Sequence, residues 1–345
     1  MKIEKIRLTQ EKIKLKVPFV TALREVHFAE FIRVRVICDE GVFAYGEAPA
    51  TKAITGETLE SITQDIKSIK EQFYGVEVDA ALELLHRQKI GSGAKAALDI
   101  AFVTLQAKEK KYSLSEYFGV VDQTPLKTDI TISLGSQEQM LHDAKEALRE
   151  GMDILKVKLG NDIAHAIQTT QLISKELPHA KLLIDANQAW SLDETLMYIK
   201  ELQGYRLELI EQPVAAKELE ALKIIRQKSS FKILADEAVF SLEDMKKVIA
   251  KGAADMINIK VMKCGGVSQA VAMLRYAREM QIECMLGSMI EGPYSINLTL
   301  YLAFAYRDVV KFIDLDSPLL YKTLPDELDF IYSGADISFK EHWQA

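Results

Sequence analysis

The chain has few cysteines. Cys38, Cys264 and Cys284 are the only three in 345 residues, and they are far apart in the sequence. An odd number of scattered cysteines excludes a disulfide framework, and their separation lacks the spacing of a metal-binding cluster. We therefore expect free, buried thiols in a protein of a reducing compartment.

Long apolar runs, a recognisable targeting segment and an excess of basic residues are also lacking. No apolar stretch approaches the length of a membrane span, and the first residues interleave charged with apolar side chains. The formal net charge is −7, which gives no reason to expect nucleic acid as a partner, and no polybasic patch suggests a membrane surface. We expect a cytoplasmic protein.

What is present fits an ordinary globular protein, with 48% hydrophobic and 27% charged residues. The first part of the chain, residues 1–125, has its own pattern. Alternating apolar residues predict antiparallel strands over 3–15 and 31–37, and apolar stripes at helical spacing predict helices over 59–69 and 94–105. We interpret this part as an α+β domain.

Two loops of this domain are candidates to cover a binding site, because loops on a rigid scaffold often carry recognition. They are predicted at 18–27 and 48–57. Arg24 lies in the first of them. Taken alone, such a residue is more often a solvated surface arginine than a ligand contact.

From residue 126 to about 318, strand-like and helix-like segments alternate at the spacing of βα units. The eight predicted strands are 128–134, 154–160, 182–187, 206–211, 232–236, 255–260, 283–288 and 311–316. Eight parallel strands close naturally into a barrel, whose reactive groups lie at the C-terminal ends of the strands. The remaining residues, 319–345, contain no further βα unit and are expected to pack back on the first domain.

The chemistry of the barrel is indicated first by Lys156 and Lys158, which share one face of a strand because side chains alternate along it. An edge strand with a solvated lysine face would explain this pair alone. However, four more strands follow at intervals of 24 to 27 residues, each ending near an ionisable group: Asp185, Glu211, Asp236 and Lys260.

Asp185, Glu211 and Asp236 end three consecutive predicted strands, so their carboxylates should converge. That much negative charge is tolerable only around a cation, and oxygen ligands favour Mg²⁺. The alternative is three unrelated helix caps or surface acids. Lys158 and Lys260 fall on the strands before and after this trio and would face each other across the site as bases. Such a site suits removal of a proton from a carbon next to a carboxylate, with return of a proton on the opposite face.

The motifs resemble those of a known family. They are Lys156-Val-Lys158, Ile184-Asp-Ala-Asn187, Ile210-Glu-Gln-Pro213, Ala235-Asp-Glu237 and Asn258-Ile-Lys260-Val-Met-Lys263-Cys-Gly-Gly266. In order and spacing they are similar to the enolase superfamily, and specifically to its muconate lactonizing enzyme subgroup. The resemblance implies an N-terminal capping domain and a modified (β/α)7β barrel. It also implies Mg²⁺ on Asp185, Glu211 and Asp236, and an acid/base pair of Lys158 and Lys260.

Within the subgroup, Asp314 and Asp316 resemble the Asp-x-Asp motif of dipeptide epimerases, in which two carboxylates pair with the free α-ammonium of the substrate. A solvated strand end is the alternative. Arg24 resembles an arginine that meets the glutamyl carboxylate in L-Ala-D/L-Glu epimerases, and Thr131 and Lys156 are assigned as further substrate-binding residues. The segment 287–293 departs from the usual Met-x-Glu-Ser pattern, which leaves the fit of the substrate open.

The resemblance implies a Mg²⁺-dependent dipeptide epimerase that inverts the α-carbon of the C-terminal residue of L-Ala-Xaa, with L-Ala-D/L-Glu from murein peptides as the favoured substrate. The family often forms homo-oligomers, and we expect one here. Three alternatives stay open: an N-acylamino acid racemase, a cycloisomerase or o-succinylbenzoate synthase-type lyase, and a non-catalytic barrel that binds small acids.

Overall fold

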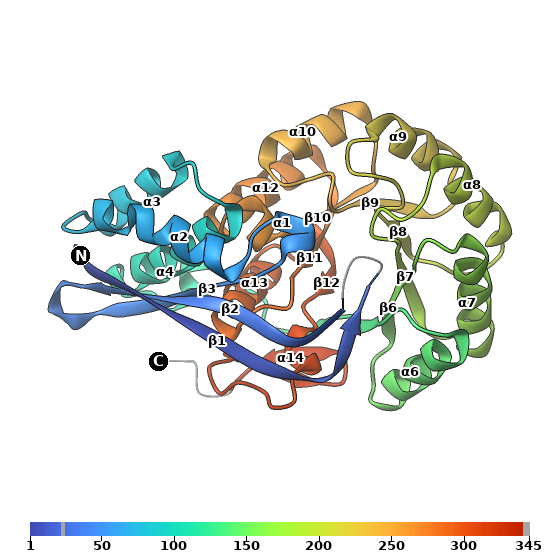
Figure 1. The fold of residues 1–345 in the computed structure, drawn as a ribbon, viewed down its shortest axis with the longest axis horizontal. Helices are drawn as coiled ribbons and strands as arrows, with labels where there is room; N and C mark the ends of the chain where they lie inside the picture. Colours follow the sequence, from blue (N-terminus) through green and yellow to red (C-terminus); the bar gives the residue numbers. More distant parts are fainter. Residues whose placement is uncertain (22–24, 341–345) are drawn as a thin grey trace.

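A long antiparallel hairpin opens the chain. It consists of β1 (Ile3–Val20) and β2 (Glu25–Cys38), and β3 (Phe43–Pro49) completes a three-stranded sheet. The computed structural model describes residues 1–21 and 25–340. Figure 1 shows the hairpin running from the N-terminal helices to the barrel.

The N-terminal domain is α+β, as predicted. Its helices cover one face of the sheet: α1 (Lys52–Thr55), α2 (Leu59–Ile69), α3 (Val78–Arg87), α4 (Ser92–Glu109) and α5 (Leu114–Phe118), with 3₁₀ turns η1 (Asp39–Gly41) and η2 (Lys70–Phe73). Alternate residues of β2, such as Ile32, Val34 and Val36, are buried in the same core as the apolar stripe of α4, because a strand directs alternate side chains to one face.

The loop predicted over residues 18–27 is shorter than expected. Phe19 pairs with Val26 and Val20 with Glu25, so both strands extend into the predicted loop. A register shift between Lys14 and Phe19 precedes this pairing. Pro18, which lacks an N–H to donate, lies inside the shifted stretch, where a proline is tolerated in a strand.

The second half of the fold is an eight-stranded parallel sheet curved into a barrel, as predicted. Its strands are β5 (Ile130–Ile132), β6 (Ile154–Lys158), β7 (Lys181–Asp185), β8 (Leu209–Glu211), β9 (Lys232–Ala235), β10 (Met256–Lys260), β11 (Glu283–Gly287) and β12 (Val310–Asp314), paired in that order. The first and last strands are joined by Asp129 N–H, which donates to Ile313 O at 3.0 Å.

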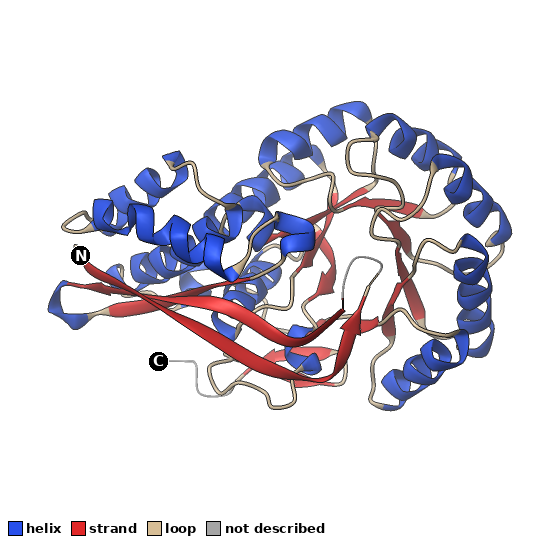
Figure 2. Ribbon diagram, viewed as in Figure 1, coloured by secondary structure: helices blue, strands red, loops and turns tan. Residues whose placement is uncertain are grey.

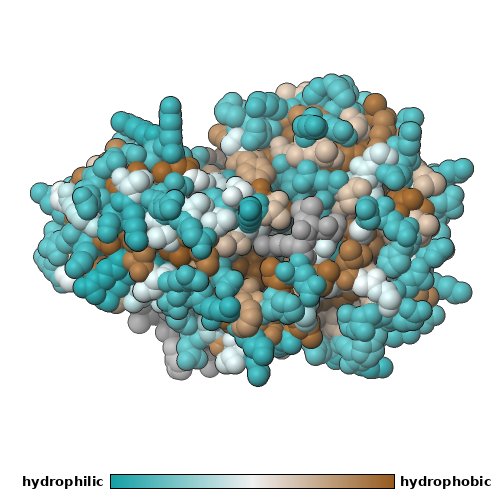
Figure 3. All heavy atoms as spheres, viewed as in Figure 1, coloured by the Kyte–Doolittle hydropathy of each residue, from teal (hydrophilic) through white to brown (hydrophobic). Residues whose placement is uncertain are grey.

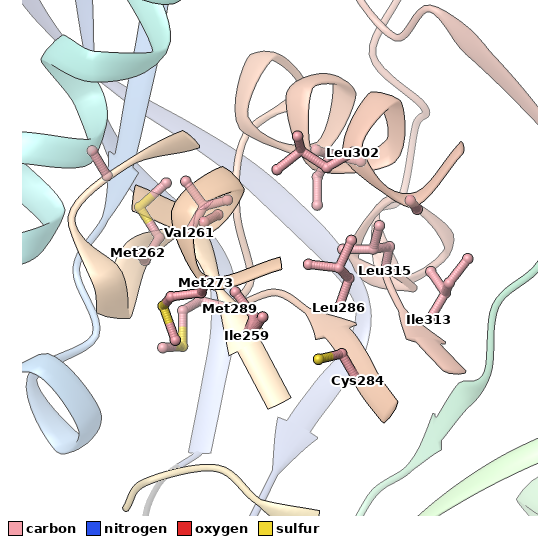
Figure 4. Close-up of a cluster of buried hydrophobic side chains, with 14 of the residues drawn as sticks. Ile259, Val261, Met262, Met273, Cys284, Leu286, Met289, Leu302, Ile313 and Leu315 are labelled. Carbon is pink, nitrogen blue, oxygen red and sulfur yellow. The ribbon is translucent and has the colours of Figure 1, made fainter. Parts of the chain in front are cut away.

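Helices surround the strands of the barrel (Figure 2). They are α6 (Gln137–Arg149), α7 (Ile163–Glu176), α8 (Leu192–Glu201), α9 (Leu219–Lys228), α10 (Leu242–Lys251), α11 (Val261–Cys264), α12 (Val267–Met280) and α13 (Pro293–Ala305). Figure 4 shows how the outward side chains Ile259, Leu286 and Ile313 lie in one apolar cluster with Leu302 of α13. This packing holds the strands that end at the site.

The last residues form α14 (Ser317–Leu320) and the strands β13 (Phe330–Ser333) and β14 (Asp336–Phe339). β14 pairs with β4 (Leu126–Lys127), and Tyr321 forms a β-bridge with Leu15 of the hairpin. None of the helices in residues 1–21 and 25–340 has the length and apolar character needed to cross a membrane.

Candidate active site

The interior of the barrel is layered. Its lowest layer is an apolar floor, made by Ile154, Leu183, Leu209, Leu234, Met256, Phe312 and Met285. Two residues further along these strands, on the same face, come the ionisable or amide side chains of Lys156, Asp185, Glu211, Asp236, Asn258 and Asp314, whereas Met285 is followed there by Gly287. The layers put the polar groups at the C-terminal ends of the strands, where barrels carry their chemistry.

Lys158 and Lys260 lie in this polar region on strands that are separated by three others. Lys158 Nζ is 2.5 Å from Asp185 Oδ2, and Lys260 Nζ is 2.9 Å from Asp236 Oδ2. Both side chains are almost fully buried and line the same cavity. Burial would lower the pKa of Lys260, but the carboxylates of Asp236, Glu211 and Asp314 together raise it above its ordinary value.

Lys156 is the most enclosed of the lysines, with no exposed surface. Its ammonium lies 2.5 Å from Asp314 Oδ2, 2.7 Å from Glu211 Oε2 and 3.4 Å from Asp185 Oδ2. Burial alone would lower the pKa of Lys156, but these carboxylates raise it well above its usual range. Lys156 is therefore a fixed positive charge inside the barrel.

The three acids expected to converge are fully buried and end adjacent strands, with Asp185 opposite Glu211 in the β7–β8 register. They do not form a compact trio in this structure. The cluster of three acids whose ligand atoms all lie within 4.8 Å, among the residues described, is instead Asp129, Asp314 and Asp316. The lysine ammonium groups take up the charge of Asp185 and Asp236, and the pKa of each, which burial would raise, is lowered.

Glu211 differs from its neighbours. Asn258 Nδ2 donates to Glu211 Oε1 at 2.7 Å, but Glu211 Oε2 is buried and accepts no hydrogen bond from the described part of the chain, although it forms an ion pair with Lys156. Burial and the nearby Asp185 raise the pKa of Glu211. Oxygen donors that are buried and incompletely satisfied suit a hard cation.

The acidic cluster of Asp129, Asp314 and Asp316 lies at β5 and β12. It contacts Lys156 through Asp314, whereas Glu211 contacts the same ammonium from β8. Thr131 N–H donates to Asp316 Oδ2 at 2.8 Å. Burial and Asp314 raise the pKa of Asp316 to about 6, and burial followed by Asp314 raises that of Asp129 well above its usual value. The cluster has more negative charge than Lys156 balances, so it favours a cationic group.

A cavity opens onto these groups. Lys158, Lys260, Asp314, Asp316 and Thr131 line its wall together with Asp236 and Asn187, and the N-terminal domain contributes Phe19, Thr21, Ala53 and Ile54. Ser288, Met289 and Ile290 complete the barrel side. The face shown in Figure 3 is mostly hydrophilic, with hydrophobic residues scattered over it.

Residues 3–119 match the model of the mandelate racemase / muconate lactonizing enzyme N-terminal domain, and residues 139–334 match the enolase C-terminal domain-like model. The chain belongs to the enolase superfamily. Its N-terminal domain is of the mandelate racemase / muconate lactonizing enzyme type.

Several members of the superfamily are similar over the full length. An L-amino acid-D/L-Glu epimerase of Sulfurimonas denitrificans is 55% identical, over 98% of this chain and 99% of that protein. The substrate-liganded L-Ala-D/L-Glu epimerase of Bacillus subtilis has a TM-score of 0.92 at 35% identity, covering 99% of this chain and 97% of that one. The dipeptide epimerase of Enterococcus faecalis V583, complexed with Mg and L-Leu-L-Tyr, has a TM-score of 0.91 at 32% identity, covering 99% and 98%.

Of the residues that the sequence suggested for this site, Lys158, Lys260, Thr131, Asp314 and Asp316 line one cavity. Arg24 lies outside the described residues. Asp129 was missed, although it lies within the strand predicted over residues 128–134 and immediately precedes β5. Glu237, buried near Asn187 Nδ2 at 3.3 Å, was also given no role. Burial, followed by Asp236 and Asp185, raises the pKa of Glu237 to about 8.

Lys263, a residue of the 258–266 motif, contacts Asp236. Its ammonium donates to Asp236 Oδ1 at 2.6 Å and to Asn258 O at 3.1 Å. The residue is buried and comes from α11, the single turn that follows Lys260. Lys263 therefore fixes Asp236 from the side opposite the cavity wall.

Proposed function

We propose that this chain is a dipeptide epimerase that inverts the α-carbon of the C-terminal residue of L-Ala-Xaa dipeptides, with L-Ala-D/L-Glu favoured. The observation that carries this proposal is the shared cavity wall, on which Lys158 and Lys260 accompany Asp314 and Asp316. Two buried lysines on separated strands suit proton transfer on two faces of one carbon. The two carboxylates, of which Asp314 is paired with Lys156 and Asp316 with no lysine of the described residues, suit the substrate ammonium.

We propose Asp185, Glu211 and Asp236 as the residues that hold Mg²⁺. Their all-oxygen donor set and their adjacent strands support this choice, as does Glu211 Oε2, which is buried and accepts no hydrogen bond from the described residues beyond its ion pair with Lys156. When bound, the ion supplies positive charge beside the substrate carboxylate, which otherwise resists loss of the neighbouring α-proton. A bound ion would also neutralise part of the carboxylate charge that now raises the pKa of Lys260. The pKa of Lys260 would then be lower, which favours a neutral amine there.

The chain's own residues then divide the remaining work. One lysine takes the α-proton and the other returns a proton on the opposite face. Asp314 and Asp316 hold the ammonium, with Thr131 fixing Asp316 through its N–H, and Lys156 supplies a permanent positive charge near the substrate. Arg24 is proposed to meet the side-chain carboxylate of a glutamyl residue.

We also propose the remaining assignments made from the sequence. They are a capping domain over 1–125, a barrel over 126–318, a segment over 319–345 that closes back on the cap, a homo-oligomer, a cytoplasmic location and a role in murein peptide metabolism. The bridge from Tyr321 to Leu15 supports the closing segment.

The test is NMR in D₂O with Mg²⁺, following deuterium at the α-carbon over a library of L-Ala-L-Xaa dipeptides, with N-succinyl amino acids as controls. Exchange and inversion limited to dipeptides, and fastest for Glu, are expected. The variant Arg24→Met should lose the preference for Glu while keeping activity on apolar residues. Exchange confined to the succinylated controls would refute the proposal.

A further inference from the structure

Three helices share an unusual N-terminus. α4, α12 and α13 each have a glycine as N-cap, Gly91, Gly266 and Gly292, and so lack a capping side chain of their own. Elsewhere in the chain, helices such as α6 and α8 are capped by their own serine. An uncapped helix start leaves backbone N–H groups without partners.

In each of the three, a carboxylate from another element takes the place of the missing cap. At α13, Tyr294 N–H donates to Glu47 Oε2 at 2.9 Å. At α12, Ser268 N–H donates to Asp99 Oδ1 at 3.1 Å. At α4, Gly93 N–H donates to Glu57 Oε2 at 2.8 Å. The donor is always two residues after the glycine.

The glycines are required by the carboxylates. A Cβ on Gly292 would overlap the carboxylate of Glu47, and a Cβ on Gly266 would overlap that of Asp99. Each carboxylate therefore occupies the space that a side chain would fill and also accepts the helix N–H. We call Glu47 and Asp99, with the glycine that each faces, the two interdomain plugs. A negative group at this position also interacts favourably with the helix dipole.

Both plugs connect the N-terminal domain to the barrel, and both are completely buried. Glu47 lies on β3 and is held by Arg33, whose Nε and Nη2 are 2.8 and 2.7 Å from Glu47 Oε1. Asp99 lies on α4, and its Oδ2 is 3.0 Å from His86 Nε2. Ser268 Oγ also donates to Asp99 Oδ2.

Each plug lies at the C-terminal end of a short segment that begins at the active site. The segment that ends at Gly266 begins at Lys260 and contains Lys263, whose ammonium holds Asp236. The segment that ends at Gly292 begins with Ser288, Met289 and Ile290, which line the cavity. The N-terminal domain thus contacts the barrel wall at two places, through Asp99 at the start of α12 and through Glu47 at the start of α13.

We propose that Asp99 and Glu47 are positioning residues, Asp99 for the Lys260–Lys263 segment and Glu47 for the cavity wall at 288–290. This inference rests on the proposed function. Asp99 acts on the lysine of one face only, so its loss should affect the two stereoisomers unequally. Glu47 acts on the wall, so its loss should weaken substrate binding for both isomers alike.

The first experiment is amide hydrogen exchange, read by mass spectrometry on the full chain without substrate. Asp99→Asn should speed exchange in peptides that cover 261–268 and leave 288–296 unchanged, and Glu47→Gln should do the reverse. Ser113→Ala, which removes an exposed cap of α5 far from the cavity, serves as the control and should change neither. Faster exchange spread evenly over the barrel would overturn the inference.

The second experiment measures α-proton exchange and inversion with both isomers of the dipeptide. Asp99→Asn should lower kcat between tenfold and about a hundredfold, the scale of a misplaced catalytic group, and should slow exchange far more from one isomer than from the other. Glu47→Gln should raise KM several-fold for both isomers. Equal loss from both isomers in Asp99→Asn would overturn the positioning role.

Ser268→Ala removes a single hydroxyl next to Asp99 and serves if Asp99→Asn does not fold. It should show the same unequal loss on a smaller scale, and an equal loss would count against the inference. A wild-type enzyme without activity on dipeptides would contradict the proposed function, whereas the amide exchange pattern would still decide whether the plugs hold their segments.

Discussion

Gly287 gives a sharp test of how the barrel positions Lys260. It is the last residue of β11, and a Cβ built on it would lie 2.7 Å from Asn258 Oδ1 and 2.9 Å from Lys260 Cε. An ordinary contact begins near 3.4 Å, so Gly287→Ala must move Lys260 Cε by about 0.5 Å. The backbone of Gly287 is outside the left-handed region, so the effect is one of space and not of backbone strain.

The displacement should reduce turnover more than stability. A shift of about 1 Å in a reacting group costs roughly 10²-fold, so half of that shift should lower kcat about tenfold, or ~1.4 kcal/mol of the barrier. Overpacking a core costs about 1–3 kcal/mol, and we expect the lower end because the lysine side chain can bend.

The assay is inversion of L-Ala-L-Glu followed by NMR, together with thermal unfolding. Gly135→Ala is the matched control, because the nearest atom to its added Cβ is 3.8 Å away; it should keep the wild-type rate. A folded Gly287→Ala enzyme with unchanged kcat would show that packing against Gly287 does not set the position of Lys260.

Four further outcomes are expected. Lys158→Ala and Lys260→Ala should each abolish inversion, while each still exchanges the α-proton of one isomer with D₂O; full turnover in both would exclude the two-base mechanism. Asp316→Asn should raise KM for dipeptides by tenfold or more, because a charge-assisted hydrogen bond contributes about 1.5–3 kcal/mol, and steady-state kinetics with an unchanged KM would contradict the ammonium site. Removal of divalent ions with EDTA should abolish activity and Mg²⁺ should restore it; activity that survives dialysis against chelator would argue against the metal. Burial raises the pKa of Glu291 from 4.5 to about 7, so the folded state keeps a proton that the unfolded state releases, and this residue makes stability fall as the pH rises from about 4.5 to 7. Glu291→Gln should flatten that fall in Tm measured from pH 4.5 to 8, and an identical pH profile would contradict it.

The barrel could be predicted because its strands are short apolar runs with an ionisable group at the end. Glu211 and Lys260 are the last residues of β8 and β10, as expected, and Asp185 ends β7, two residues before the predicted end of that strand. Parallel strands buried on both faces leave this pattern in the sequence. The same regularity placed the two lysines on opposite sides of the barrel.

The contacts that could not be predicted are mostly those between residues far apart in the sequence. Nothing near Gly292 indicates that Glu47 fills the space beside it, and nothing near Gly266 indicates Asp99, because each pair meets only when the two domains pack. The extent of β1 and β2 past Pro18 was missed for a local reason, since proline suggests a turn more often than a strand. The spread of Asp185, Glu211 and Asp236 depends on which ammonium group each one meets, which the spacing of the strands does not specify.

The apolar floor of the barrel also decides how water reaches the lysines. Ile154, Leu183 and Met285 belong to a layer that blocks the barrel beneath Lys156. Solvent protons must therefore arrive from the mouth, where Phe19 and Ile54 of the N-terminal domain lie. In the proposed mechanism, a substrate that fills that mouth would let each lysine return the proton it has just taken, so the rate of deuterium uptake would measure how often the mouth opens as well as how fast the proton is removed.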